Sequence, residues 1–297
     1  MTSKLKVLLV ITIIGLAIGC KEKQDLKQPD VKAEVVEDIN GVPLIWIGNR
    51  VEKAKERLNS SEAGKVIWNA MEAHGGLKKW FANGALSMRF NYQPLDGKTQ
   101  RDSYQVVDSW GSRAVHHSTL DSTASYGWTG KTAWMKAKDS AFFKYDTKFW
   151  AMTPLYLMGF PFVLDGQGVN LELLPRSNYM GRPNDVVKIT YDEGTGDAPD
   201  DYYILHFDAQ THLLLATRYI VSYPGYFKKG EHLPEKFMEI GPLVNIEGIL
   251  LPSELKTHWT VDGLPGDYLT LIEISEMSFK KDLAEDYFDL PENAKEL

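Results

Sequence analysis

Residues 85–110 read ALSMRFNYQPLDGKTQRDSYQVVDSW, and this stretch decides the fold class. Polar and apolar residues alternate through residues 85–92, which is typical of a strand in a sheet with one solvated face. Pro94 to Gly97 are turn residues, and they separate a predicted strand at 86–93 from a second at 99–110. Because the turn is short, the two strands should pair as an antiparallel hairpin.

The same strand pattern continues through most of the chain. So many consecutive strands exceed what a flat open sheet normally holds, so the sheet should curl. We therefore predict a mainly β (α+β) fold built on a strongly curved antiparallel sheet. The further strands are expected at residues 113–120, 125–136 with a turn at 129–131 inside it, 169–174, 185–192, 202–207, 212–221, 237–246, 249–261 and 268–279.

Two segments predict helices that would cover the concave face of this sheet. Residues 61–80 show apolar side chains at helical spacing, with Ser60 or Ser61 as the cap. His74 lies beside that apolar face, where we expect a hydrogen-bonded packing histidine rather than a functional one. Residues 141–164, AFFKYDTKFWAMTPLYLMGFPFVL, are strongly apolar, and their prolines and glycine limit them to one or two short helices.

The N-terminus has the parts of a secretory signal peptide. Lys4 and Lys6 precede an apolar run, and small residues lead to Cys20. The run LAIGC at residues 16–20 resembles the lipobox of bacterial lipoproteins, in which the peptide is cut before the cysteine and the thiol is acylated. We therefore predict a signal peptide over residues 1–19 and a Cys20 held to the membrane by a lipid anchor of diacylglycerol and palmitate. Plain secretion with an incidental cysteine is the alternative.

Residues 20–40 are charged and contain no aromatic side chain, which is typical of a disordered tether. Lys21 stands where inner-membrane lipoproteins of enterobacteria carry Asp, so the resemblance favours the outer membrane of a bacterial cell envelope. Residues 41–297 are then left for a single folded domain.

Composition excludes several kinds of partner and chemistry. The formal charge of −7 becomes −9 when Lys4 and Lys6 leave with the signal peptide. Nothing in that charge favours binding to DNA or RNA. Cys20 is the only cysteine, so once it is acylated no thiol remains for a disulfide, a thiolate metal site or a nucleophile.

Several features together resemble the outer-membrane lipoprotein-sorting superfamily, the LolA/LolB/LppX-like half-barrels. They are the lipobox, the His74-Gly75-Gly76 helix end, the long meander with its apolar insertion, the FDAQTHLL hairpin at 207–214 and GILLP at 248–252. The resemblance covers residues 61–291 and extends to a Bacteroidetes lipoprotein branch whose N-terminal helix also ends in His-Gly-Gly. It implies a half-barrel at 41–297 that is lidded by helices and holds the acyl chain of a lipid or a lipoprotein partner. It implies no catalytic residue, metal or cofactor.

Residues 141–164 are the candidate wall of such a cavity. A half-barrel has too few side chains to fill its own mouth, so bulky residues or a ligand must occupy it. Each buried methylene of an acyl chain contributes about 0.8 kcal/mol. The segment is consistent both with a mobile plug or lid hinged at Pro154 and Gly159 and with a fixed core helix. The candidate ligand-binding residues are Phe142, Phe143, Phe149, Trp150, Met152, Leu155, Tyr156, Met158, Phe160 and Phe162.

No motif for catalysis or metal binding stands out. His116 and His117 are neighbours on a strand and should point to opposite faces, so they cannot readily share a metal. The remaining histidines lack the spacing of zinc ligands. The acidic loop with Asp197, Asp200 and Asp201 lacks the register of a calcium loop. We therefore expect a non-catalytic carrier of an apolar ligand.

Two other functions stay open at this stage. The eight Trp and fourteen Tyr would suit a sugar platform, and paired carboxylates are plentiful, so a glycan-binding or glycan-cleaving surface lipoprotein is one. A purely structural envelope lipoprotein with a filled barrel is the other. Aromatic side chains around an apolar cavity, rather than an open polar groove, would favour the carrier.

Overall fold

The computed structural model describes residues 38–297. The predicted signal peptide, the lipid attachment site Cys20 and the tether up to residue 37 lie outside the described residues and stay predictions. The described chain begins in a short ribbon of β1 (Asp38–Ile39) paired with β2 (Val42–Pro43), so regular structure starts slightly before residue 41.

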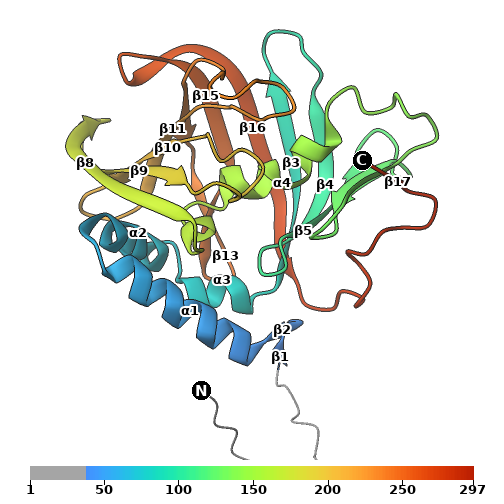
Figure 1. Ribbon diagram of the computed structural model, residues 1–297, viewed down its shortest axis with the longest axis horizontal. Helices are drawn as coiled ribbons and strands as arrows, with labels where there is room; N and C mark the ends of the chain where they lie inside the picture. The colour runs from blue at the N-terminus through green and yellow to red at the C-terminus, as the bar shows by residue number, and fades with distance from the viewer. Residues whose placement is uncertain (1–37) are drawn as a thin grey trace, which may run out of the picture. The chain divides into compact units, whose positions relative to one another are not determined.

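The core of the molecule is one antiparallel sheet of thirteen strands in the order β17-β7-β6-β5-β4-β3-β16-β15-β12-β11-β10-β9-β8. The edge strands β17 and β8 do not pair with each other, so the sheet curves without closing into a barrel. The predicted curved antiparallel half-barrel is confirmed (Figure 1). Its strands are β3 (Ala85–Pro94), β4 (Arg101–Asp108), β5 (Arg113–Ser118), β6 (Ser125–Trp128), β7 (Ala133–Lys136), β8 (Val169–Tyr179), β9 (Arg182–Tyr191), β10 (Tyr203–Asp208), β11 (Leu214–Tyr219), β12 (Lys236–Ile240), β15 (Glu254–Val261), β16 (Leu264–Lys280) and β17 (Lys295–Glu296).

The opening hairpin forms as its alternation predicts. β3 pairs with β4 in a register that sets Met88 opposite Gln105 and Phe90 opposite Ser103. Leu86, Met88 and Phe90 are buried to within a few per cent, which is the apolar face of the alternating pattern. The other face of this hairpin is more exposed and carries the Arg89–Asp102 ion pair, with Nη2 and Oδ2 2.7 Å apart.

Two predicted strands are each divided in the structure. The expected strand at 237–246 separates into β12 and β13 (Leu243–Ile246), because Gly241 and Pro242 interrupt the ladder. The expected strand at 249–261 separates into β14 (Ile249–Pro252) and β15. β13 and β14 form a separate ribbon, so they are not members of the large sheet.

Four α-helices and a single 3₁₀ turn accompany the sheet in residues 38–297, more helix than the sequence patterns predict. Figure 1 shows α4 in the hollow of the curved sheet and α1 to α3 grouped at one end of it. Helix α1 was not predicted, although Ile47, Val51, Ala54 and Leu58 have the spacing of a buried helix face. The helices are α1 (Leu44–Asn59), α2 (Glu62–Ala73), α3 (Leu77–Ala82), α4 (Thr147–Met158) and the 3₁₀ turn η1 (Phe162–Leu164).

The predicted helix at 61–80 is two helices, α2 and α3, divided at Gly75 and Gly76. Ser61 caps α2 by accepting a hydrogen bond from Gly64 N at 3.1 Å. Gly75 has φ +120°, and a Cβ there would lie 2.1 Å from the carbonyl oxygen of Gly248. Only glycine fits this close approach, which lets Leu250 N donate to His74 O at 2.8 Å. The helix end is thereby fixed to the β13–β14 ribbon.

Candidate functional site

A cavity of about 520 Å³ lies between α4 and the concave face of the sheet. Its volume is within the range of about 300–1,000 Å³ that is usual for small-molecule sites. Strands β3 and β9 to β12 supply one wall, α4 the opposite wall, and α3 and η1 one end.

Six of the ten predicted ligand-binding residues line this cavity and four do not. Phe142 and Phe143 pack on each other with ring centroids 4.9 Å apart, away from the cavity. Met158 is buried in the core, and Phe160 stands behind Tyr156 with centroids 5.1 Å apart. The six that line the cavity are Phe149, Trp150, Met152, Leu155, Tyr156 and Phe162.

Helix α4 is apolar over most of its surface, with an exposed Lys148 in its first turn, which is typical of a helix that is largely buried. Asp146 Oδ1 caps it by accepting from Phe149 N at 3.1 Å. On the flank toward β5, the Nε2 of His116 lies 2.8 Å from Ala151 O. A carbonyl only accepts, so Nε2 carries the proton. These contacts tie α4 into the core on the β5–β7 side, while its other side lines the cavity.

Strand register aligns polar groups in a row on the sheet wall of the cavity. Tyr203 of β10 is directly opposite Tyr219 of β11, and Tyr219 is directly opposite Lys236 of β12. Directly opposed residues of antiparallel strands share a face, and all three line the cavity. The rings of Tyr203 and Tyr219 stack at 5.6 Å with an interplanar angle of 11°. The row therefore combines phenol hydroxyls and one ammonium group.

Four phenols of the cavity wall stay neutral. Burial raises the pKa of Tyr156, Tyr191, Tyr203 and Tyr219 above its ordinary value. The hydroxyls of Tyr156 and Tyr191 hydrogen-bond to each other across the cavity wall, from α4 to β9. These tyrosines thus present mainly ring surface to the hollow.

The acidic side chain of Asp201, in the cavity wall, already accepts hydrogen bonds from the protein. Asp201 Oδ1 accepts hydrogen bonds from the backbone N of Ser222 at 2.6 Å and from its Oγ at 2.7 Å. Burial raises the pKa of Asp201, and the hydrogen bonds from Ser222 oppose that shift. Asp201 therefore holds the loop before β10 to the chain after β11.

The end of the cavity near α1 is fastened by two arginines. Arg50 of α1 pairs with Asp165, donating from Nη2 to Oδ1 at 2.9 Å. This hydrogen bond, with the nearby carboxylate charge, raises the pKa of Arg50. Arg57 donates from Nη2 to Leu164 O at 2.6 Å. Both bonds join α1 to the segment that follows α4, so α1 covers this end of the hollow.

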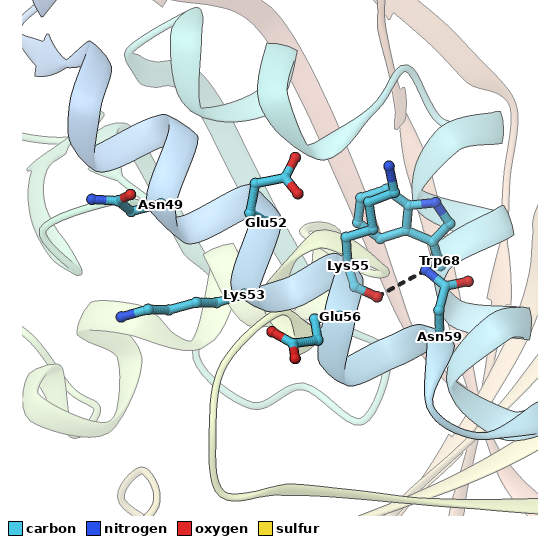
Figure 2. Close-up of a pocket in the computed structure, with 7 residues that line it drawn as sticks. All are labelled: Asn49, Glu52, Lys53, Lys55, Glu56, Asn59 and Trp68. Carbon is cyan, nitrogen blue, oxygen red and sulfur yellow. Dashed lines mark hydrogen bonds between the residues drawn. The ribbon is translucent and has the colours of Figure 1, made fainter.

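A second hollow lies on the outside of α1, between α1 and Trp68 of α2 (Figure 2). Figure 2 shows lysines and glutamates interleaved along the helix, with Asn59 Nδ2 donating to Lys55 O at 2.8 Å. Mixed charges on exposed side chains are usual for a solvated helix face. We therefore assign the candidate site to the interior cavity.

Three histidines for which the sequence makes a specific prediction, His74, His116 and His117, are placed as it expects. His74 is 2% exposed and its Nδ1 donates to Ala70 O at 2.8 Å, which confirms a hydrogen-bonded packing histidine. His116 is buried and His117 exposed, so the two point to opposite faces as predicted. No group of three or more His, Cys, Asp or Glu side chains placed to hold a metal occurs within residues 38–297.

Sequence reasoning missed the sheet wall of the cavity. Tyr203, Leu205 and Phe207 lie on one face of a predicted strand, so the sequence indicates which face points inward. Nothing in the alternation shows that this face borders a hollow rather than a filled core. Lys236 begins its strand, where a charged residue resembles an ordinary solvated strand end.

The geometry defines an open antiparallel half-barrel with helices in and across its mouth and a cavity beneath them. A LolA superfamily protein of Nitrosomonas europaea has a similar structure, with a TM-score of 0.52 at 10% identity over 77% of this chain and 97% of that one. The likeness shows that the chain has the LolA-like fold.

An outer membrane lipoprotein-sorting protein domain of Vibrio parahaemolyticus gives a TM-score of 0.47 at 10% identity over 82% of this chain and 97% of that one. No protein-family model and no curated protein sequence matches the chain. Within residues 38–297, no helix is long and apolar enough to cross a membrane.

Proposed function

We propose that this chain is a lipid-anchored protein of the bacterial envelope, at the outer membrane, that holds an acyl chain of a lipid or lipoprotein without covalent chemistry. The observation that carries the proposal is the cavity of about 520 Å³ between α4 and the concave face of the sheet. The LolA-like fold supports it, because a neighbour with this fold belongs to the LolA superfamily.

The character of the cavity wall favours a carrier over a glycan platform. The rings of Tyr156 and Tyr203 pack together with centroids 5.3 Å apart, and Phe149 packs on Tyr223 at 4.9 Å. Sugar platforms need exposed flat rings, whereas these rings enclose the hollow. Met152 adds an adaptable thioether to the same wall.

Native mass spectrometry with lipid extraction tests the cavity. We expect the mature chain carrying Cys20→Ser to copurify with an acyl-chain species. Met152→Trp, which fills the cavity, should abolish that species. Leu120→Trp is the matched control, because Leu120 is 89% exposed. A protein that stays empty and does not bind added fatty acids or phospholipids would contradict the proposal.

The anchor has its own test. Cys20→Ser should move the protein from the membrane fraction to the soluble fraction, because the acylated thiol is the proposed attachment point. The matched control Ser3→Cys leaves Cys20 in place and should not change the fractionation. If the Cys20→Ser protein stays with the membranes, the lipobox hypothesis is wrong.

A further inference from the structure

Arg101 stands among aromatic rings beside the cavity without a counter-ion. Its guanidinium carbon lies 4.5 Å from the ring centre of Trp150 and 4.8 Å from that of Tyr92, two residues that line the cavity. Tyr145 lies at 5.4 Å. The Nε atom is buried and has no hydrogen-bond partner within residues 38–297. Rings hold the cation in place but leave its donors available.

Lys236 is the second cation at this part of the cavity. Its Nζ lies 6.0 Å from the ring centre of Tyr219 and 5.9 Å from that of Trp259, its two cross-strand neighbours. Among the described residues, neither Lys236 nor Arg101 forms an ion pair with a carboxylate.

The charges around Lys236 do not favour its ammonium form. Burial is the largest cause that lowers the pKa of Lys236 to about 8. Repulsion from Lys98 and Arg101 acts in the same direction, and the carboxylate of Asp96 opposes it only in part. Asp96 is itself paired with Lys98, with Oδ2 and Nζ 2.6 Å apart. Two partly desolvated cations that repel each other are unfavourable unless an anion joins them.

We propose that Arg101 and Lys236 bind the anionic end of the amphiphile whose acyl chain fills the cavity. The inference rests on the proposed function and specifies its ligand class: an acyl chain that ends in a carboxylate or a phosphate. The guanidinium and the ammonium supply charge-assisted donors for such a group. The aromatic and aliphatic wall from Trp150 to Leu155 receives the chain.

The arrangement gives a role to two cations that stand among aromatic rings at the cavity. A chain alone would be held equally well by an apolar residue at position 236, since burial of methylenes needs no charge. A headgroup bound here fixes which end of the ligand enters first. It also discriminates against neutral lipids, because they leave both cations unpaired.

The test compares each acid with its neutral counterpart, using the quenching of tryptophan fluorescence near neutral pH on the mature chain with Cys20→Ser. The probes are palmitate against methyl palmitate, and palmitoyl lysophosphatidic acid against monopalmitoylglycerol. We expect the acid of at least one pair to bind about tenfold or more tightly than its neutral counterpart. The pair with the larger ratio identifies the headgroup as carboxylate or phosphate.

Variants assign the preference to the two cations. Lys236→Met keeps the apolar stem of the side chain and removes its charge. Lys236→Met and Arg101→Gln, made separately, should each reduce the ratio of acid affinity to neutral-ligand affinity toward one, while binding of the neutral ligand persists. Lys131→Gln is the matched control, because Lys131 is exposed in the turn between β6 and β7 and should leave the ratio unchanged. The wild-type comparison needs no variant, so a variant that fails to fold does not stop the test.

The binding results distinguish failure of the headgroup site from failure of the proposed carrier function. Equal binding of acid and neutral ligands by the wild-type protein overturns the inference and leaves the carrier function standing. An acid preference that survives in both variants overturns the assignment to Arg101 and Lys236. If no acyl ligand binds at all, both the inference and the proposed function fail.

Discussion

The two flanks of α4 are packed very differently. Toward β5 to β7 the helix meets a filled core, where His116 stacks on Tyr126 at 4.3 Å and Phe143 packs edge-on against the same tyrosine at 5.1 Å. Toward β9 to β12 it faces the hollow lined by Tyr203, Tyr219 and Lys236. One apolar helix thus anchors itself with one flank and leaves the other for a ligand. This division lets a half-barrel keep a cavity and remain stable, because the cost of the hollow is confined to one flank.

Truncation of a phenylalanine on the filled flank should have the largest effect on stability, and the same truncation on the cavity flank a much smaller one. Phe143→Ala removes a ring that is 8% exposed, and we expect the free energy of unfolding to fall by about 3–4 kcal/mol. Phe149→Ala on the cavity flank should cost only about 1 kcal/mol, because that ring is half-buried beside an existing hollow. Urea denaturation of both variants measures the difference. Equal losses would contradict the asymmetry.

Acid should weaken the filled flank through His116. Burial lowers the pKa of His116 from 6.5 to about 4, so the unfolded chain takes up the proton first as the pH falls. The stabilising effect of the neutral ring is complete above pH 6.5 and is lost as the pH falls toward 4. We expect up to about 3 kcal/mol of stability to be lost through this group.

Denaturation at a series of pH values tests this, with His116→Phe as the variant. That variant should flatten the acid limb of the profile but not abolish it, because burial also lowers the pKa of His206 to about 4. His117→Phe is the matched control, since His117 is exposed. A profile unchanged by His116→Phe would show that this histidine does not control acid stability.

Substitution of small residues on α4 by leucine should have the smallest effect on stability. On the filled flank it should lower stability, and on the cavity flank it should weaken ligand binding instead. Ala151→Leu overfills the packed flank, where Ala151 is 1% exposed, and should cost about 1–3 kcal/mol. Thr153→Leu projects into the cavity and should change stability by less than about 0.5 kcal/mol. It should instead weaken acyl-chain binding. Thermal melts and ligand titrations on the same samples give both quantities.

These comparisons also decide whether α4 is a lid or a fixed core helix. A lid would tolerate Phe143→Ala and Ala151→Leu and lose only ligand binding. The bond from His116 to Ala151 and the cap at Asp146 favour a helix fixed along its β5–β7 flank. On that basis we expect ligand entry to involve the cavity side of α4, near Phe149 and Tyr223, rather than displacement of the whole helix.

Much of the fold could be predicted from local patterns. Alternation at 85–92 predicted β3 and its buried face, and the apolar run at 141–164 predicted a short, proline-interrupted helix within the hollow. Helix α1 was missed because its charged residues mask a buried face of only three side chains, Ile47, Ala54 and Leu58. The division of α2 from α3 was missed because it depends on a close approach between Gly75 and Gly248, far apart in sequence.

The helical wall of the site could be predicted from local patterns, and the sheet wall could not. Six of the proposed lining residues were found because they lie in one apolar segment with a strong composition signal, five of them on α4 and Phe162 in η1. The sheet wall was not found, because Tyr92, Tyr203, Tyr219 and Lys236 belong to separate strands. Their convergence depends on strand order, in which β16 and β15 separate β3 from β12. No local pattern specifies that order.

The sequence by itself determined that the chain builds a long antiparallel sheet, which must curve, and one apolar helical segment to occupy it. Side-chain period and turn residues are local properties, so they can be read along the chain. Only the tertiary structure decided which flank of α4 is filled and which is hollow. It also decided that Lys236 lines the hollow and that Arg101 stands over the lining residues Tyr92 and Trp150. The register of distant strands sets those contacts, and a shift of one residue would turn each side chain to the opposite face of the sheet.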